Sequence, residues 1–239
     1  MRAWISGAGT SGSMSRSGRK GIVAAKTAVW LAALVPAALL ALDAGRGRLG
    51  ANPIEEVMDR TGWWGLLLLT ATLAVTPLRR LTRWHKVIRF RRLLGLFAFF
   101  YLTSHLLSYL VLDQFFALSY ILEDIAERPF ITVGFTAWLI LLALAVTSTT
   151  GWIRRLGRRW ALLHRLVYVA AGLGTLHFLW KVKADTREPL VFMGVLTVLL
   201  ALRLRRRSRR FGKTEPGLAA RLGNSAAGTD VAGESFQVL

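Results

Sequence analysis

The stretch RRLLGLFAFFYLTSHLLSYL at residues 91–110 decides the fold, because a long apolar run follows directly on two arginines. A membrane-spanning helix needs about 20 predominantly apolar residues, and this stretch supplies them. Working outward, comparable apolar blocks recur along the chain, of which the last is the shortest. They are 22–42, 62–78, 93–112, 130–147, 162–180 and 189–202. The lipid core offers no water to the backbone, so only helices and closed β-barrels can span it, and these blocks are too long for barrel strands. We therefore predict an all-α, polytopic membrane helix bundle with six transmembrane helices.

The connections between the blocks alternate in charge. Arginine clusters follow the second, fourth and sixth blocks, at 79–92, 154–159 and 203–210, whereas the other connections are mixed or acidic. Because positively charged loops stay on the cytoplasmic side, this alternation places both termini in the cytoplasm of a bacterium with the protein in its inner membrane.

The two ends of the chain differ in composition from the blocks between them. Residues 1–20 are rich in Ser and Gly, and we expect a disordered cytoplasmic segment there. The first block could be a signal peptide, but it is longer than the usual apolar core of about 7–15 residues, so we expect a retained helix. Residues 21–202 then form the transmembrane domain, and 203–239 form a basic and then disordered cytoplasmic tail.

Charge and cysteine content exclude several classes of protein. The formal net charge is +19, but the arginines stand at the ends of apolar blocks, where they face anionic membrane lipids rather than nucleic acid. The absence of cysteine excludes a thiolate-held iron–sulfur cluster and a cysteine-ligated zinc site. Any metal must therefore be held by histidine, carboxylate or another ligand without a thiolate.

Three of the four histidines lie within apolar blocks, where ionisable groups are costly and usually functional. The fourth, His85, lies in a basic loop. His105 is twelve residues into the third block, and His177 is thirteen residues beyond His164 in the fifth, which puts both at roughly 18–20 Å from the cytoplasmic end. Two histidines that face each other from neighbouring helices can bind one haem from both sides.

The level near the cytoplasm holds a less regular set of residues. His164 lies there on the fifth block, and Arg91, with Arg92 beside it, occupies the third block fourteen residues before His105. The pattern suggests a second haem with an open or unusual sixth position and with propionates paired to arginine. The alternative is that both arginines are membrane-surface anchors. On an ideal helix His164 and His177 would point about 140° apart, so a local irregularity is needed.

Several stretches resemble the MsrQ family, the haem-binding membrane subunits of periplasmic methionine sulfoxide reductase systems, within the wider ferric-reductase-like transmembrane group. These are RRLLGLFAFFYLTSHLLSY at 91–109, RPFITVG at 128–134, TSTTGWIRRLGRRWALLHRLVY at 147–168 and LHFLW at 176–180. The resemblance implies six helices around a ferric-reductase-like haem b core. It implies one or two haems, with His105, His164 and His177 as iron ligands and Arg91 as a weaker candidate, and flavin mononucleotide (FMN) as a further cofactor.

The resemblance also implies a place in an electron-transfer chain. Electrons would arrive from a cytoplasmic flavin reductase or the quinone pool and leave to a periplasmic, molybdopterin-containing MsrP-type subunit that repairs oxidised proteins. Catalysis would belong to that partner, because this chain has no nucleotide-binding G-x-G-x-x-G motif and no cysteine. Two alternatives stay open: another haem b metal or quinone reductase, and a haem-free transporter. No internal repeat stands out, which disfavours a transporter.

Overall fold

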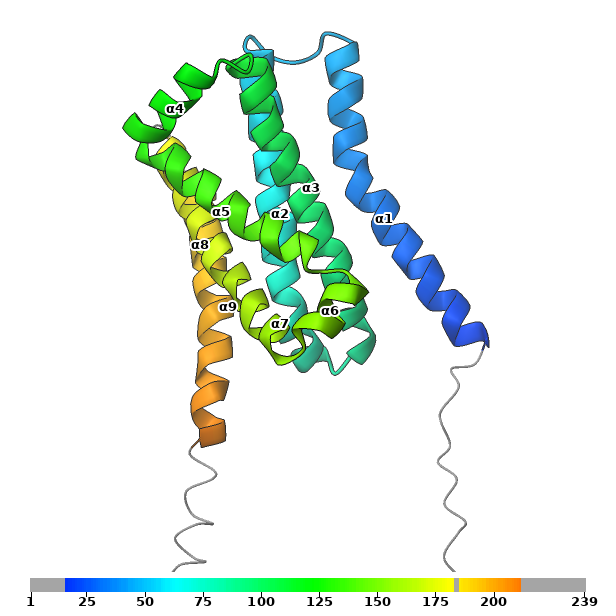
Figure 1. Ribbon diagram of the computed structural model, residues 1–239. Coiled ribbons are helices and arrows are strands. Elements are labelled where there is room, and N and C mark those ends of the chain that lie inside the picture. The colour runs from blue at the N-terminus through cyan, green and yellow to red at the C-terminus, as the bar shows by residue number, and fades with distance from the viewer. Residues whose placement is uncertain (1–15, 183–184, 212–239) are drawn as a thin grey trace, which may run out of the picture.

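The computed structural model describes residues 16–182 and 185–211, and every regular element within them is helical (Figure 1). The elements are α1 (Arg16–Gly45), α2 (Pro53–Thr82), η1 (His85–Phe90), α3 (Arg91–Leu107), η2 (Ser108–Asp113), α4 (Leu118–Glu127), α5 (Pro129–Val146), α6 (Thr150–Leu156), α7 (Arg158–Leu163), η3 (His164–Leu166), α8 (Val167–Lys181) and α9 (Arg187–Phe211). The all-α membrane bundle predicted from the sequence is confirmed.

Five helical segments are long and apolar enough to cross a membrane, at 21–45, 53–82, 85–113, 129–146 and 158–181. The sixth predicted span corresponds to α9, a helix that is not among these five candidates within the residues whose side chains the structure describes. It nevertheless packs along α8 and α2 and runs antiparallel to α8 (Figure 1). The chain is therefore a multi-pass membrane protein with five clear candidate spans and a sixth long helix beside them.

The bundle has two chemically different ends. The basic end carries the junction of α2 with α3, helices α6 and α7, and the last turns of α9, and the N-terminal end of α1 also lies there (Figure 1). The acidic end carries the connections α1–α2, α3–α5 and α8–α9. Asn52 begins α2 at the acidic end, since its side chain accepts a hydrogen bond from the Glu55 amide at 3.3 Å and Pro53 follows it.

Helix α2 is the centre of the bundle. Half of its most apolar stretch is buried inside the protein, against 6% for α1. The core draws on five helices, and its buried members are Leu69, Leu73, Ala98, Leu141, Leu144, Val167, Ala170, Ala171 and Leu196. Helix α1 contributes none of these residues and leans away from the other helices (Figure 1). The core is thus a five-helix unit with α1 attached at its side.

Several element boundaries differ from those predicted. Pro77 does not close the second helix, because a proline removes only one bond from the ladder and α2 continues to Thr82. The connection 113–128 is not a simple loop, since it contains the amphipathic helix α4. The fifth predicted helix is divided at His164 by the 3₁₀ turn η3. Helix α1 begins at Arg16, whereas residues 1–15 and 212–239, where disorder was expected, lie outside the described residues.

Candidate functional site

The structure brings His105 of α3 and His177 of α8 together near the acidic end. Their ring centres lie 6.0 Å apart with the ring planes at 80°. A ring nitrogen coordinates a transition metal from about 2 Å, so two imidazoles that share one metal ion have ring centres about 6 Å apart. The pair therefore has the spacing of two axial ligands on opposite sides of one metal.

Both rings are held by the same kind of hydrogen bond. Nδ1 of His105 donates to the carbonyl oxygen of Met58 at 2.8 Å, and Nδ1 of His177 donates to that of Phe130 at 2.7 Å. Each carbonyl stands 47 residues before its histidine. Because the proton resides on Nδ1, Nε2 keeps its lone pair, which is the form that binds a metal. The main chain thus fixes both tautomers as well as both ring positions.

A glycine makes room for each ring, four residues after the carbonyl that the histidine binds. A Cβ on Gly62 would lie 3.1 Å from Nδ1 of His105, and one on Gly134 would lie 2.6 Å from Nδ1 of His177. The helix pairs α2–α3 and α5–α8 therefore use one device twice. Sequence reasoning missed these glycines and carbonyls, although the equal spacing before each histidine is a signal that could have revealed them.

Ion pairs close the acidic end next to this histidine pair. Lys181, one turn after His177, forms an ion pair with Asp59 of α2 and lies 3.7 Å from Glu55. Asp59 directly follows Met58, whose carbonyl holds His105. The pairs tie α8 to α2 at the level where the two imidazoles meet, so the same contact that joins these helices also supports the site.

His164 lies at the other, basic end, in the 3₁₀ turn that divides α7 from α8. Its ring stacks on Trp160 with centres 3.9 Å apart, and its Nδ1 donates to the Trp160 carbonyl at 3.2 Å. Its Nε2 is buried and makes no hydrogen bond of normal geometry among the described residues, although the Leu144 main chain lies close enough to act on the imidazole. A buried polar atom without a partner is costly, and a metal or cofactor at this nitrogen would satisfy it.

Arg91 begins α3 and lies half-buried, close enough to His164 for its charge to act on the imidazole. Its neighbour Arg92 is exposed, so the structure brings only one member of the predicted arginine pair to His164. His85 is also exposed, on η1 in the connection between α2 and α3. The four predicted site residues thus fall into two sites, one with His105 and His177 and one with His164 and Arg91.

The residues present fit haem better than a bare metal ion. Within 16–182 and 185–211, no group of three or more His, Asp or Glu side chains gathers as a metal ion would require. The acidic end instead offers two imidazoles at the spacing of axial ligands, with glycines beside them, and the basic end offers one unpartnered imidazole nitrogen beside a cation. Haem iron takes its protein ligands from the two axial directions only.

Comparison with known proteins identifies close relatives of the chain. The family model described as ferric reductase like transmembrane component matches residues 61–175, which include His105 and His164 and end just before His177. The chain is 53% identical over 189 residues to the protein-methionine-sulfoxide reductase heme-binding subunit MsrQ of Xanthomonas axonopodis pv. citri, covering 77% of this chain and 87% of that one. Its identity to MsrQ of Herminiimonas arsenicoxydans is 50% over 182 residues, covering 75% and 84%.

Proposed function

The chain belongs to the MsrQ family, and from this premise we propose that it is the haem b membrane subunit of a methionine sulfoxide reductase system. In this role it carries electrons across the bacterial inner membrane, with both termini in the cytoplasm. The donor is a cytoplasmic flavin reductase or the quinone pool. The acceptor is a periplasmic, molybdopterin-containing MsrP-type subunit, on which the repair of oxidised periplasmic proteins takes place.

The facing pair of His105 and His177 is the observation that carries this proposal. The two imidazoles have Nδ1 tied to main-chain carbonyls and ring centres 6.0 Å apart, which leaves Nε2 of both available to one iron between them. A transporter that used these histidines for proton transfer or helix packing would have no need to fix both in one tautomer. The arrangement therefore favours an axial ligand pair over that alternative.

The second site supports a second haem at the basic end. His164 would hold its iron from one side through the buried, unpartnered Nε2. Arg91 would either face the side of the iron opposite His164 or pair with a haem propionate. Its positive charge beside His164 suits the pairing with a propionate better. Haem b, when bound, supplies reversible one-electron chemistry, while the chain supplies the ligands and the insulating bundle. FMN would be a further cofactor on the cytoplasmic side.

The ligands are tested by the haem content and the reduced-minus-oxidised spectrum of four purified variants. His105→Ala and His177→Ala should each abolish the signal of one haem, because either change removes an axial ligand from the same iron. His164→Ala should remove or alter a different signal and leave the first largely intact. His85→Ala is the matched control and should change nothing. Wild-type spectra in all four variants would overturn the assignment.

The role in methionine sulfoxide reduction is tested with membranes that contain this chain alone. A cytoplasmic flavin reductase should reduce the haem without any loss of sulfoxide. Adding the periplasmic molybdopterin subunit together with protein-bound methionine sulfoxide should reoxidise it, and His105→Ala should block that reoxidation. If wild-type haem stays reduced in the complete mixture, this assignment is wrong and the chain is instead a metal or quinone reductase.

A further inference from the structure

Four arginines converge at the basic end from four different elements. They are Arg80 of α2, Arg91 of α3, Arg165 of η3 and Arg203 of α9. Arg203 lies within electrostatic range of the charges of the other three. Its guanidinium group also lies over the ring of Tyr168, 4.5 Å from the ring centre, which holds it in place. Arg91 is half-buried and the other three arginines are exposed, and the repulsion among like charges favours an anion beside them.

The protein itself supplies no counterion in the part of the chain that the structure describes. None of the four arginines takes part in an ion pair there. Every described carboxylate belongs to an element at the opposite, acidic end, namely Asp43, Glu55, Glu56, Asp59, Asp113, Glu123, Asp124, Glu127, Asp185 and Glu188. An anion bound beside the cluster would therefore balance charge that the described helices leave unpaired.

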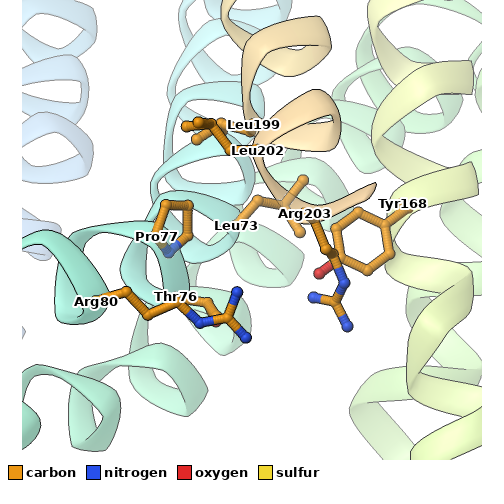
Figure 2. A pocket seen from close by; sticks show the side chains of 8 residues that line it. All are labelled: Leu73, Thr76, Pro77, Arg80, Tyr168, Leu199, Leu202 and Arg203. Atoms are coloured by element: carbon orange, nitrogen blue, oxygen red, sulfur yellow. The ribbon is translucent and has the colours of Figure 1, made fainter. Parts of the chain in front are cut away.

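A small hollow between α2, α8 and α9 lies beside the cluster. Its accessible volume is about 10 Å³, room for about one water molecule, so an anion would sit at its mouth rather than inside it. Its polar lining is Thr76, Arg80, Tyr168 and Arg203, and leucine side chains such as Leu73 and Leu199 complete it. Figure 2 shows the guanidinium groups of Arg80 and Arg203 on the same side of this hollow, with the ring of Tyr168 beside Arg203. Arg91 links the hollow to the second site, since its charge acts on both Arg203 and His164.

We infer that this arginine cluster binds a phosphate group. The planar fork of an arginine matches the oxygens of a phosphate, and several forks from separate helices can surround one dianion. Two sources carry this group to the basic end of a membrane protein: the phosphate of FMN and the headgroup of an anionic phospholipid. If the phosphate belongs to FMN, which rests on the proposed function, the arginine cluster would hold the flavin at the end of the bundle where His164 lies.

The test compares binding to purified haem-loaded protein in nanodiscs of phosphatidylcholine. Arg80→Gln combined with Arg203→Gln removes two members of the cluster. Arg154→Gln combined with Arg158→Gln is the matched control, because it removes the same charge from exposed arginines at the same end. Equilibrium dialysis measures FMN, riboflavin and inorganic phosphate. Native mass spectrometry measures phosphatidylglycerol retained from nanodiscs that contain it. Haem content is recorded for every sample.

If FMN is the source, FMN should bind the wild type at least about tenfold more tightly than riboflavin, since riboflavin lacks the phosphate. The cluster variant should lose that advantage, and the control variant should keep it. If a lipid is the source, FMN and riboflavin should bind alike, and only the cluster variant should lose phosphatidylglycerol. Either result supports a phosphate site.

Two results would overturn the inference. Equal behaviour of the cluster and control variants toward every probe would show that the hollow has no preference for phosphate. Loss of haem in the cluster variant alone would show that the arginines serve the carboxylates of haem instead. The proposed function fails separately, through the spectra of the histidine variants described above, and such a failure leaves the phosphate-binding result of this test unchanged.

Discussion

At the scale of single residues, the orientation of the facing histidines depends on the main chain rather than on other side chains. Met58 lies in the second turn of α2 and Phe130 in the first turn of α5, and each carbonyl oxygen has a second lone pair available for the imidazole. No single side-chain replacement at these two positions removes that acceptor. The sensitive positions are instead Gly62 and Gly134, where any side chain occupies the space of the ring.

Gly134→Ala should therefore displace His177 and remove the signal of the haem proposed at this pair. The added Cβ would meet three ring atoms at 2.6–3.0 Å, and real Cβ contacts are not that short. Gly62→Ala should have a weaker effect, because its nearest contact to His105 is 3.1 Å. Gly172→Ala is the matched control in α8, with nothing within 4 Å of the added atom. The measurement is haem content per chain.

An outcome in which the Gly172 and Gly134 variants hold equal haem would contradict this account of the site. The comparison also separates packing from helix propensity. Alanine is more favourable than glycine in a helix interior by about 1 kcal/mol, so propensity alone would make all three variants slightly more stable. Only a direct contact with the imidazoles predicts that haem is lost from the Gly134 variant, lowered in the Gly62 variant and kept in the Gly172 variant.

Sequence reasoning located these histidines but not what holds them. The regular rise of a helix was enough to place His105 and His177 at one level, and the structure brings them together. The glycines and carbonyls were not found, because they belong to neighbouring helices and are distant in sequence. Helix pairing, which the apolar blocks do not encode, determines which glycine lies against which histidine.

At the scale of elements, irregular turns decide where functional side chains lie. An uninterrupted fifth helix would point His164 and His177 about 140° apart. The 3₁₀ turn of η3 changes this register at His164 itself, and Gly157, with φ +49, separates α6 from α7 shortly before it. The need for an irregularity could be predicted from the spacing of the histidines, but its position could not, since no proline or glycine marks residues 164–166.

Helix α4 is the element that the sequence analysis overlooked. Asp124 on its buried face accepts a hydrogen bond from the Tyr109 hydroxyl at 2.9 Å and lies 3.1 Å from the Arg128 guanidinium. The carboxylates that dominate its composition favour a loop. The apolar residues between these carboxylates have helical spacing. That spacing is recognised only when one face of the segment is known to be buried.

A buried hydroxyl attaches helix α1 to the five-helix core, in addition to the ion pair of Asp43 with Arg60 and the edge-to-face contact of Trp30 with Phe97. The Tyr101 hydroxyl donates to the Ala33 carbonyl at 2.7 Å and accepts from the Ala37 amide at 3.0 Å. In an unbroken helix those two backbone groups would bond to each other. Pro36 lies in the same turn and has no amide hydrogen to give, so the tyrosine bridges a turn that is already weakened.

Tyr101→Phe should loosen α1 and lower the free energy of unfolding by about 1 kcal/mol, the usual contribution of a buried hydrogen bond. Thermal unfolding in detergent measures the loss. Spin labels on cysteines introduced at Leu39 and Phe100 should report a broader distance distribution, and the absence of natural cysteines makes the labelling specific. Tyr120→Phe removes the same hydroxyl from an exposed tyrosine and is the control. Identical distance distributions in both variants would refute the role of Tyr101.

At the scale of the whole molecule, charge divides the bundle. Described carboxylates gather at one end, whereas the other end carries arginines from α2, α3, α6, α7 and α9. Long helices separate these ends, so the charge difference extends across the thickness of the bundle (Figure 1). The sequence predicted this arrangement well, because it depends only on the order of blocks and loops along the chain and needs no knowledge of how the helices pair.

The same division predicts the direction in which the protein crosses the membrane. Positively charged loops are retained in the cytoplasm, so the basic end should face inward and the acidic end outward. A reporter inserted near Arg155, in α6, or fused after Leu239 should read as cytoplasmic, and one inserted near Glu123, in α4, should read as periplasmic. The Leu239 fusion also decides whether α9 spans the membrane. A cytoplasmic reading means that α9 crosses, because a chain with both termini in the cytoplasm crosses an even number of times. A periplasmic reading after Leu239 would contradict the six-helix topology. It would place α9 outside the membrane, because cleavage of α1 after insertion would not move the C-terminus. The mass of the mature chain decides separately whether α1 is retained.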